Sequence, residues 1–136
     1  MAKIMGAHGC YSATACTAFP LDYMRKVEKA KKFKGLGFID LLVNCPTNWG
    51  FDAKNGIEIV KKAVLTGIWP LYEVENGVLK INYDPGPGKF LPVEEFLKGQ
   101  ARFKHLTKKE VREIQEAVDR EWELYRAGEY WKTDEY

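Results

Sequence analysis

Apolar positions in the first part of the chain alternate between runs typical of strands and stripes typical of helices. The small, mostly uncharged residues 10–15 predict a strand packed closely between layers, and the near-continuous apolar run 38–43 predicts a strand that helices bury on both faces. Between them, Pro20 begins a predicted helix over 20–33. Its apolar face consists of Leu21, Met24, Val27, Ala30 and Phe33. Residues before Gly9 are typical of the last turns of another helix.

A further helix is predicted after residues 44–51, which are rich in turn formers. Asn55 is expected to cap this helix, Glu58 follows three residues later, and Gly67 ends it. Its buried stripe consists of Ile57, Val60 and Val64. The resulting β-α-β-α order predicts an α/β fold with parallel strands and crossover helices. In such sheets ligands bind at the carboxyl ends of the strands, where residues 44–51 lie.

The pattern changes after Trp69. Residues 70–75 and 78–83 flank Asn76-Gly77, a strong signal for an antiparallel hairpin. Pro92 then begins a short helical stretch with Val93, Phe96 and Leu97 on one side. The last helix starts at a capping box, Thr107 to Glu110, with Leu106 and Val111 placed for a hydrophobic staple, and its apolar stripe is Ile114, Val118, Trp122 and Tyr125. We therefore predict an α/β segment over 1–68 and a hairpin with C-terminal helices over 69–136.

Composition narrows the classes of function. The 136 residues are 46% hydrophobic and 29% charged, which fits one globular domain or a piece of a larger one. A formal net charge of +2 argues against nucleic-acid binding. The longest apolar run, 36–43, contains Asp40 and is too short to cross a membrane. Three cysteines without a CxxC pair, and no signal peptide, predict a cytoplasmic protein.

Most chemistry-bearing residues favour structural roles. His8 and His105 are far apart in sequence, and the adjacent acids Glu94-Glu95 and Asp134-Glu135 do not converge on one substrate. The sequence holds no GxSxG motif, P-loop or GxGxxG motif. A basic stretch could guide an acidic partner, but a solvated helix face is the favoured interpretation, because charge runs usually form such faces. That stretch contains Arg25, Lys26, Lys29, Lys31, Lys32 and Lys34.

Cys45 has two interpretations. It follows a predicted buried strand and precedes Pro46, a step that can end a run of iron–sulfur ligands. However, a cluster normally needs four ligands, and Cys45 has no companion cysteine nearby in the sequence. A lone cysteine is more often a small buried hydrophobic residue. Spacing alone favours the structural interpretation.

Several segments, taken in order, resemble the C-terminal part of the β subunit of 2-oxoacid:ferredoxin oxidoreductases, with pyruvate:ferredoxin oxidoreductase (pyruvate synthase) as the nearest type. The resemblance extends from residue 1 to about residue 125. Its segments are residues 13–15, 23–32, 44–51, 66–77, 92–97 and 100–106.

This resemblance implies the C-terminal half of a thiamine-diphosphate-binding α/β fold. The family oxidatively decarboxylates a 2-oxoacid with coenzyme A to acyl-CoA and CO2, and passes electrons through [4Fe-4S] clusters to ferredoxin. Cys45 matches the cysteine of the family's Cys-Pro loop, the fourth ligand of the cluster nearest thiamine. Implied partners are the remainder of the β subunit, the alpha, gamma and delta subunits, ferredoxin, the 2-oxoacid and coenzyme A.

Departures from the family pattern limit what this chain does by itself. The Gly-Asp-Gly-Asp segment that binds Mg2+ and the diphosphate, and the other three cluster cysteines, are absent and are expected before residue 1. Cys10 and Cys16 match none of these ligands, and no catalytic residue is assigned. Asn48 stands where many relatives have glycine, and Asp40 where histidine is common. The chain alone is therefore expected to be inactive.

Two alternatives to a pyruvate enzyme remain. One is an oxidoreductase of the same family for a branched-chain 2-oxoacid, 2-oxoglutarate or oxalate. The other is a non-enzymatic interaction module that docks through Trp69, Trp122 and the basic helix.

Overall fold

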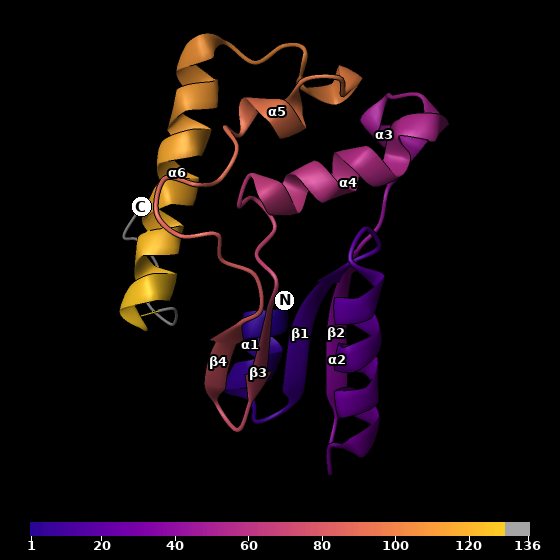
Figure 1. The fold of residues 1–136 in the computed structure, drawn as a ribbon, viewed down its shortest axis with the longest axis vertical. Coiled ribbons are helices and arrows are strands. Elements are labelled where there is room, and N and C mark those ends of the chain that lie inside the picture. The colour runs from indigo at the N-terminus through magenta and orange to yellow at the C-terminus, as the bar shows by residue number, and fades with distance from the viewer. Residues whose placement is uncertain (130–136) are drawn as a thin grey trace.

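The computed structural model describes residues 1–129 and contains a four-stranded mixed sheet (Figure 1). The strands are β1 (Tyr11–Cys16), β2 (Gly37–Leu42), β3 (Tyr72–Glu75) and β4 (Val78–Ile81), in the order β2-β1-β3-β4. β1 and β2 are parallel, whereas β3 is antiparallel to both β1 and β4. The predicted α/β class, the parallel pair and the hairpin are confirmed.

Helices follow the predicted order with one addition. They are α1 (Ala2–Ala7), α2 (Pro20–Lys32), α3 (Pro46–Trp49), α4 (Gly56–Leu65), α5 (Glu94–Leu97) and α6 (Lys108–Ala127), with 3-10 turns η1 (Ala53–Asn55) and η2 (Ala101–Phe103). The sequence predicted only a turn-rich loop where α3 lies. Pro46 explains this short helix, because its fixed φ suits the first helical position. Asn55 precedes α4 as expected but makes no side-chain capping hydrogen bond.

β1 is the central, fully buried strand, and helices cover both of its faces. Ser12 Oγ donates to the Ala2 carbonyl of α1 at 2.7 Å, whereas the Tyr11 ring lies 6.2 Å from the ring of Phe33 at the end of α2. Because neighbouring strand residues point to opposite faces, α1 and α2 cover opposite faces of the sheet. A Cβ on Gly6 would lie 2.8 Å from Val74 Cγ1, so α1 approaches the sheet too closely for a larger residue.

Three predicted burial patterns are wrong. β2 is an edge strand whose residues are exposed or half-buried, because it has a neighbour on one side only among the described residues. On α2, Leu21 and Met24 are 70% and 58% exposed, since the helix turns Lys26 toward the sheet instead. Ile57 is 57% exposed, although Val60 and Val64 of its stripe are buried.

The C-terminal elements confirm their local signals. Asn76 and Gly77 both have positive φ, 51° and 76°, as the predicted tight turn requires. Val93, Phe96 and Leu97 are buried, as expected. The division between residues 68 and 69 stays a prediction, and β3 and β4 from beyond it complete the sheet begun by β1 and β2.

α6 begins with the predicted capping box, in which Thr107 and Glu110 satisfy each other's backbone N–H groups. Farther along, Trp122 is buried and its Nε1 donates to the Gly67 carbonyl at 2.9 Å. Val118 packs against both apolar clusters of the molecule, one around α4 and α5 and one beneath the hairpin. No helix within residues 1–129 combines the length and the apolar character that a bilayer crossing requires.

Candidate functional site

The segment that leads from the carboxyl end of β2 to α3 (Figure 1) contains Cys45, which is the residue immediately before α3. Its backbone is extended, with φ −134° and ψ 87°, and its carbonyl accepts a hydrogen bond from Trp49 N at 2.9 Å. The side chain is exposed. The interpretation of Cys45 as a small buried hydrophobic residue is therefore wrong, and its sulfur is open to a ligand or a partner.

Packing contacts of Trp49 and Gly50 fix the turn that carries Cys45. Trp49 is 8% exposed and meets the ring of Phe96 edge-on at 6.1 Å. Gly50 ends α3 with a φ of 69°, and its carbonyl accepts a hydrogen bond from Ala101 N at 3.0 Å. A Cβ on Gly50 would lie 2.5 Å from the Ala101 Cβ, so η2 packs directly against the end of α3. This contact fixes the turn relative to the rest of the chain.

Arg102 of η2 is a second feature of this turn, which sequence reasoning missed. Its Cζ lies 4.2 Å from the centre of the Trp49 ring, and its Nε donates to Gln100 Oε1 at 3.1 Å. Burial lowers the pKa of Arg102, and a thiolate at Cys45 would act in the opposite direction. No carboxylate within residues 1–129 forms an ion pair with this guanidinium. The only sequence signal was its place in the resembling segment 100–106.

The other cysteines are not placed to join Cys45. Cys10 is half-buried, and Cys16 is buried with its Sγ 3.5 Å from the Val60 carbonyl that accepts its hydrogen bond. Burial raises the pKa of the Cys16 thiol. In the part of the chain that the structure describes, no three side chains of His, Cys, Asp or Glu gather to hold a metal. The donor that fits an iron–sulfur cluster here is one exposed sulfur, Cys45, so the other ligands would have to come from elsewhere.

The remaining sequence candidates occupy separate places. His8 ends α1, and His105 is exposed between η2 and α6. Glu95 forms ion pairs with Lys98 and, at 3.7 Å, with Lys62. Asp134 and Glu135 lie outside the described residues.

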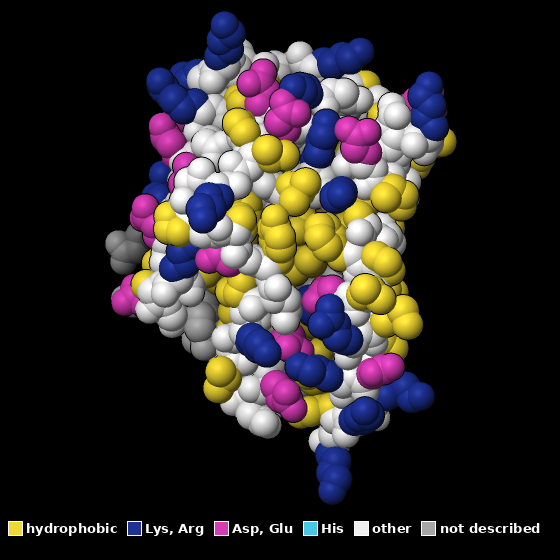
Figure 2. Space-filling view, in the orientation of Figure 1, with side chains coloured by type: hydrophobic (Ala, Val, Ile, Leu, Met, Phe, Trp, Pro, Cys, Tyr) yellow, Lys and Arg dark blue, Asp and Glu magenta, His cyan; other side chains and the backbone are white. Residues whose placement is uncertain are grey.

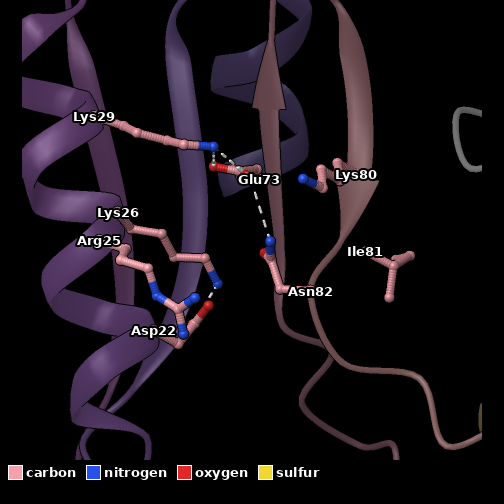
Figure 3. Close-up of a pocket in the computed structure, with 8 residues that line it drawn as sticks. All are labelled: Asp22, Arg25, Lys26, Lys29, Glu73, Lys80, Ile81 and Asn82. Carbon is pink, nitrogen blue, oxygen red and sulfur yellow. Dashed lines mark hydrogen bonds and ion pairs between the residues drawn. The ribbon is translucent and has the colours of Figure 1, made fainter.

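A separate cavity of about 280 Å³ lies between α2 and the β3–β4 hairpin (Figure 3). Lys26 on its α2 wall is 1% exposed, and its Nζ donates to the Thr14 carbonyl at 2.8 Å and to Asp22 Oδ2 at 2.6 Å. Burial lowers the pKa of Lys26, opposed by its interaction with Asp22. Figure 2 shows the charged side chains of this region below a band of apolar ones.

Glu73 is the buried acid of the same cavity. It accepts hydrogen bonds from Lys29 Nζ at 2.7 Å, Tyr11 Oη at 3.0 Å and Asn82 Nδ2 at 3.3 Å. Burial by itself would raise the pKa of Glu73, but these hydrogen bonds outweigh it and hold the pKa below its usual value. No buried side-chain nitrogen or oxygen in residues 1–129 lacks a partner. Within this cavity, the Lys29–Glu73 ion pair and the hydrogen bond from Lys26 to Thr14 tie α2 to the sheet.

The docking surface proposed for a non-enzymatic module needs a correction. Trp122 is 2% exposed, so it cannot meet a partner. Trp69 is half-buried, and its Nε1 donates to the Ala15 carbonyl at 3.0 Å. Within the basic helix, Lys26 and Lys29 are engaged with Asp22 and Glu73. These side chains stabilise the fold because their polar groups bond to this chain.

Comparison with known proteins shows close relatives. No family model matches this sequence. The chain is 48% identical over 125 residues to pyruvate synthase subunit PorB of Methanocaldococcus jannaschii, a match that covers 91% of this chain and 41% of the relative. It is 49% identical over 114 residues to ketoisovalerate oxidoreductase subunit VorB of Pyrococcus horikoshii, a match that covers 83% of this chain and 36% of the relative. It is also 45% identical over 127 residues to pyruvate synthase subunit PorB of Thermotoga maritima, a match that covers 89% of this chain and 39% of the relative. The chain thus spans about two fifths of these relatives' length.

Proposed function

The chain belongs to the family of the PorB and VorB subunits, as the C-terminal part of such a β subunit, and we propose that it serves a 2-oxoacid:ferredoxin oxidoreductase. The proposed reaction is the oxidative decarboxylation of pyruvate with coenzyme A to acetyl-CoA and CO2, with electrons passed to ferredoxin. The enzyme is a complex, and the remainder of the β subunit with the alpha, gamma and delta subunits supplies what this chain lacks. We place the complex in the cytoplasm, in keeping with three free cysteines.

The observation that carries this proposal is the position of Cys45. Its exposed sulfur follows a parallel strand of the sheet, at the edge where α/β proteins bind ligands. The turn beneath it is fixed by Trp49 and by the contact of Gly50 with Ala101. A ligand on a rigid turn loses little conformational freedom when it binds a metal. Cys45 would therefore be one of the four thiolate ligands of a [4Fe-4S] cluster.

Cofactors divide the chemistry between them. Thiamine diphosphate with Mg2+ supplies the carbanion chemistry of decarboxylation, and the cluster supplies one-electron transfer when bound. Cys45 contributes to holding the cluster, and the shell of Trp49, Phe51 and Phe96 behind it limits water on that side. We assign no residue of this chain to thiamine diphosphate or to Mg2+.

Replacement of Cys45 tests the proposal in the complete enzyme. We expect Cys45→Ala to remove the signal of one [4Fe-4S] cluster from the electron paramagnetic resonance spectrum and to lower ferredoxin reduction by more than about tenfold. Cys10→Ala, at a half-buried thiol of the same chain, is the matched control and should leave the iron content unchanged. Full iron content and normal ferredoxin reduction in the Cys45→Ala enzyme would show that Cys45 is not a ligand.

A branched-chain 2-oxoacid is the second candidate substrate. The ketoisovalerate oxidoreductase relative is 49% identical and the pyruvate synthase relative 48% identical, so identity does not separate them. Measurement of kcat/KM for pyruvate, 2-oxoisovalerate, 2-oxoglutarate and oxalate in the complete enzyme would rank them. A complete complex without activity toward any of these acids would favour the non-enzymatic interaction module instead.

A further inference from the structure

Arg102 is a fixed cation without an anionic partner among the described residues. Two other arginines pair with acids: Arg126 with Asp84 at 2.7 Å, and Arg112 with Glu116 at 3.6 Å. Arg102 has no such ion pair, although it is half-buried and burial lowers its pKa. A desolvated guanidinium is costly unless a negative charge compensates it. Because no carboxylate of the described residues is paired with Arg102, an anionic group bound next to it would find a free counter-charge.

The position of Arg102 is determined by rigid neighbours. Its guanidinium lies 4.2 Å from the ring centre of Trp49 and 4.5 Å from that of Phe103. Its Nε donates to Gln100, which is 1% exposed and bonds in turn to the Phe96 carbonyl. Such stacking and hydrogen bonding restrict the side chain to one arrangement.

Arg102 and Cys45 belong to the same small unit. Trp49, on which Arg102 stacks, is the last residue of α3, and its N–H donates to the carbonyl of Cys45 at 2.9 Å. The η2 turn that carries Arg102 is joined to α3 through Ala101 and Gly50. A thiolate at Cys45 would raise the pKa of Arg102, which is an electrostatic interaction between the two groups. A negative group bound at Cys45 would therefore lie in the field of this cation.

We propose that Arg102 is the counter-charge for the [4Fe-4S] cluster bound through Cys45 and raises its reduction potential. This inference rests on the proposed function. A cluster with four thiolate ligands is anionic and gains one further negative charge on reduction. A nearby fixed cation stabilises the reduced form more than the oxidised form, and net charge is one of the factors that set cluster potentials. Arg102 acts through the cluster and touches no substrate, so it is a positioning residue.

A redox titration of the complete enzyme, monitored by electron paramagnetic resonance, tests the proposal. We expect Arg102→Gln to lower the midpoint potential of the cluster, with the reduced-to-oxidised ratio at a fixed potential falling about tenfold, or about 59 mV for one electron. Arg102→Lys keeps the positive charge, so its cluster should have a midpoint potential closer to that of the unsubstituted enzyme. Arg112→Gln, at an exposed arginine of α6, is the matched control and should leave the midpoint unchanged.

Each outcome decides the proposal. An Arg102→Gln enzyme with full iron content and an unchanged midpoint overturns it. If the Arg102→Gln enzyme does not load the cluster, the midpoint potential of the Arg102→Lys enzyme decides. A midpoint near that of the unsubstituted enzyme supports the counter-charge. A midpoint lower by about 59 mV, equivalent to a tenfold fall in the reduced-to-oxidised ratio, contradicts it. Failure of the proposed function is recognised separately, because Cys45→Ala would then retain the cluster. Loss of the cluster in Cys45→Ala with no effect of Arg102→Gln contradicts only the role of Arg102.

Discussion

Lys26 and Glu73 bring opposite charges into one cavity, and different neighbours satisfy each of them. Lys26 is 1% exposed and Glu73 5% exposed, yet both are fully hydrogen-bonded. The sequence favoured a solvated face for Lys26, because charge runs usually form such faces and the periodicity placed Leu21 and Met24 on the apolar face. In the structure, Lys26 and Lys29 instead face the sheet and bond to Thr14 and Glu73. Residue type alone did not predict which face of α2 would be inward.

Substitution of Glu73 tests this network. Glu73→Gln removes the charge that Lys29 and Tyr11 bond to, so we expect a loss of about 1–3 kcal/mol in the free energy of unfolding. Glu75→Gln, at an exposed position of the same strand, is the control and should change it by less than about 0.5 kcal/mol. Urea denaturation of the chain followed by circular dichroism would measure both.

The effect of Glu73→Gln should also depend on pH. Because the folded-state pKa of Glu73 is below its usual 4.5, the stability gained from its charge is fully present above that pH. It is lost as the pH falls through the lower folded-state value. The difference in the free energy of unfolding between the unsubstituted and the Glu73→Gln protein should therefore narrow below about pH 4.5. A difference that stays constant down to acid pH would contradict the role of the carboxylate charge.

Elements formed by local signals were predicted well, and elements defined by their neighbours were not. The hairpin turn at Asn76-Gly77 and the capping box at Thr107 need only adjacent residues, and both are present. β2 was predicted as a doubly buried strand, but strand position in a sheet depends on partners that periodicity does not encode. Likewise, the short α3 was hidden by the turn formers around it.

The capping box of α6 gives a test at this scale. Thr107→Ala leaves the N–H of Glu110 without its hydroxyl partner and should lower the free energy of unfolding by about 0.5–2 kcal/mol. Thr107→Ser retains the hydroxyl and should recover most of that loss. Equal stability of the Ala and Ser variants in thermal denaturation would contradict a stabilising cap.

In the molecule as a whole, α6 connects the sheet to the helices above it. Val118 contacts both apolar clusters, and Trp122 bonds to the carbonyl of Gly67 at the end of α4. The candidate site was only partly accessible from sequence: family resemblance indicated Cys45, whereas Arg102 became visible once the fold placed η2 against α3. Contacts between distant segments are the part of a site that spacing along the chain does not reveal.

Gly67 tests the junction between α6 and α4. Its φ is 79°, and a Cβ there would lie 2.6 Å from Trp122 Nε1, so Gly67→Ala should cost about 2 kcal/mol or more in the free energy of unfolding. Gly99→Ala is the matched control, because Gly99 has a φ of 90° but no atom within 4 Å of the added Cβ. The excess cost at Gly67 in urea denaturation measures the clash with Trp122. An equal loss in the free energy of unfolding for Gly67→Ala and Gly99→Ala would show that backbone strain alone accounts for the effect at Gly67.

The outer side of β2 has a further consequence for handling this chain. Its backbone N–H and C=O groups face no neighbouring strand within residues 1–129, and its side chains are largely apolar. Such an edge is a template for β-augmentation, in which strands from other molecules join the sheet. At high concentration, the chain is therefore expected to lose solubility through intermolecular strand pairing before it unfolds.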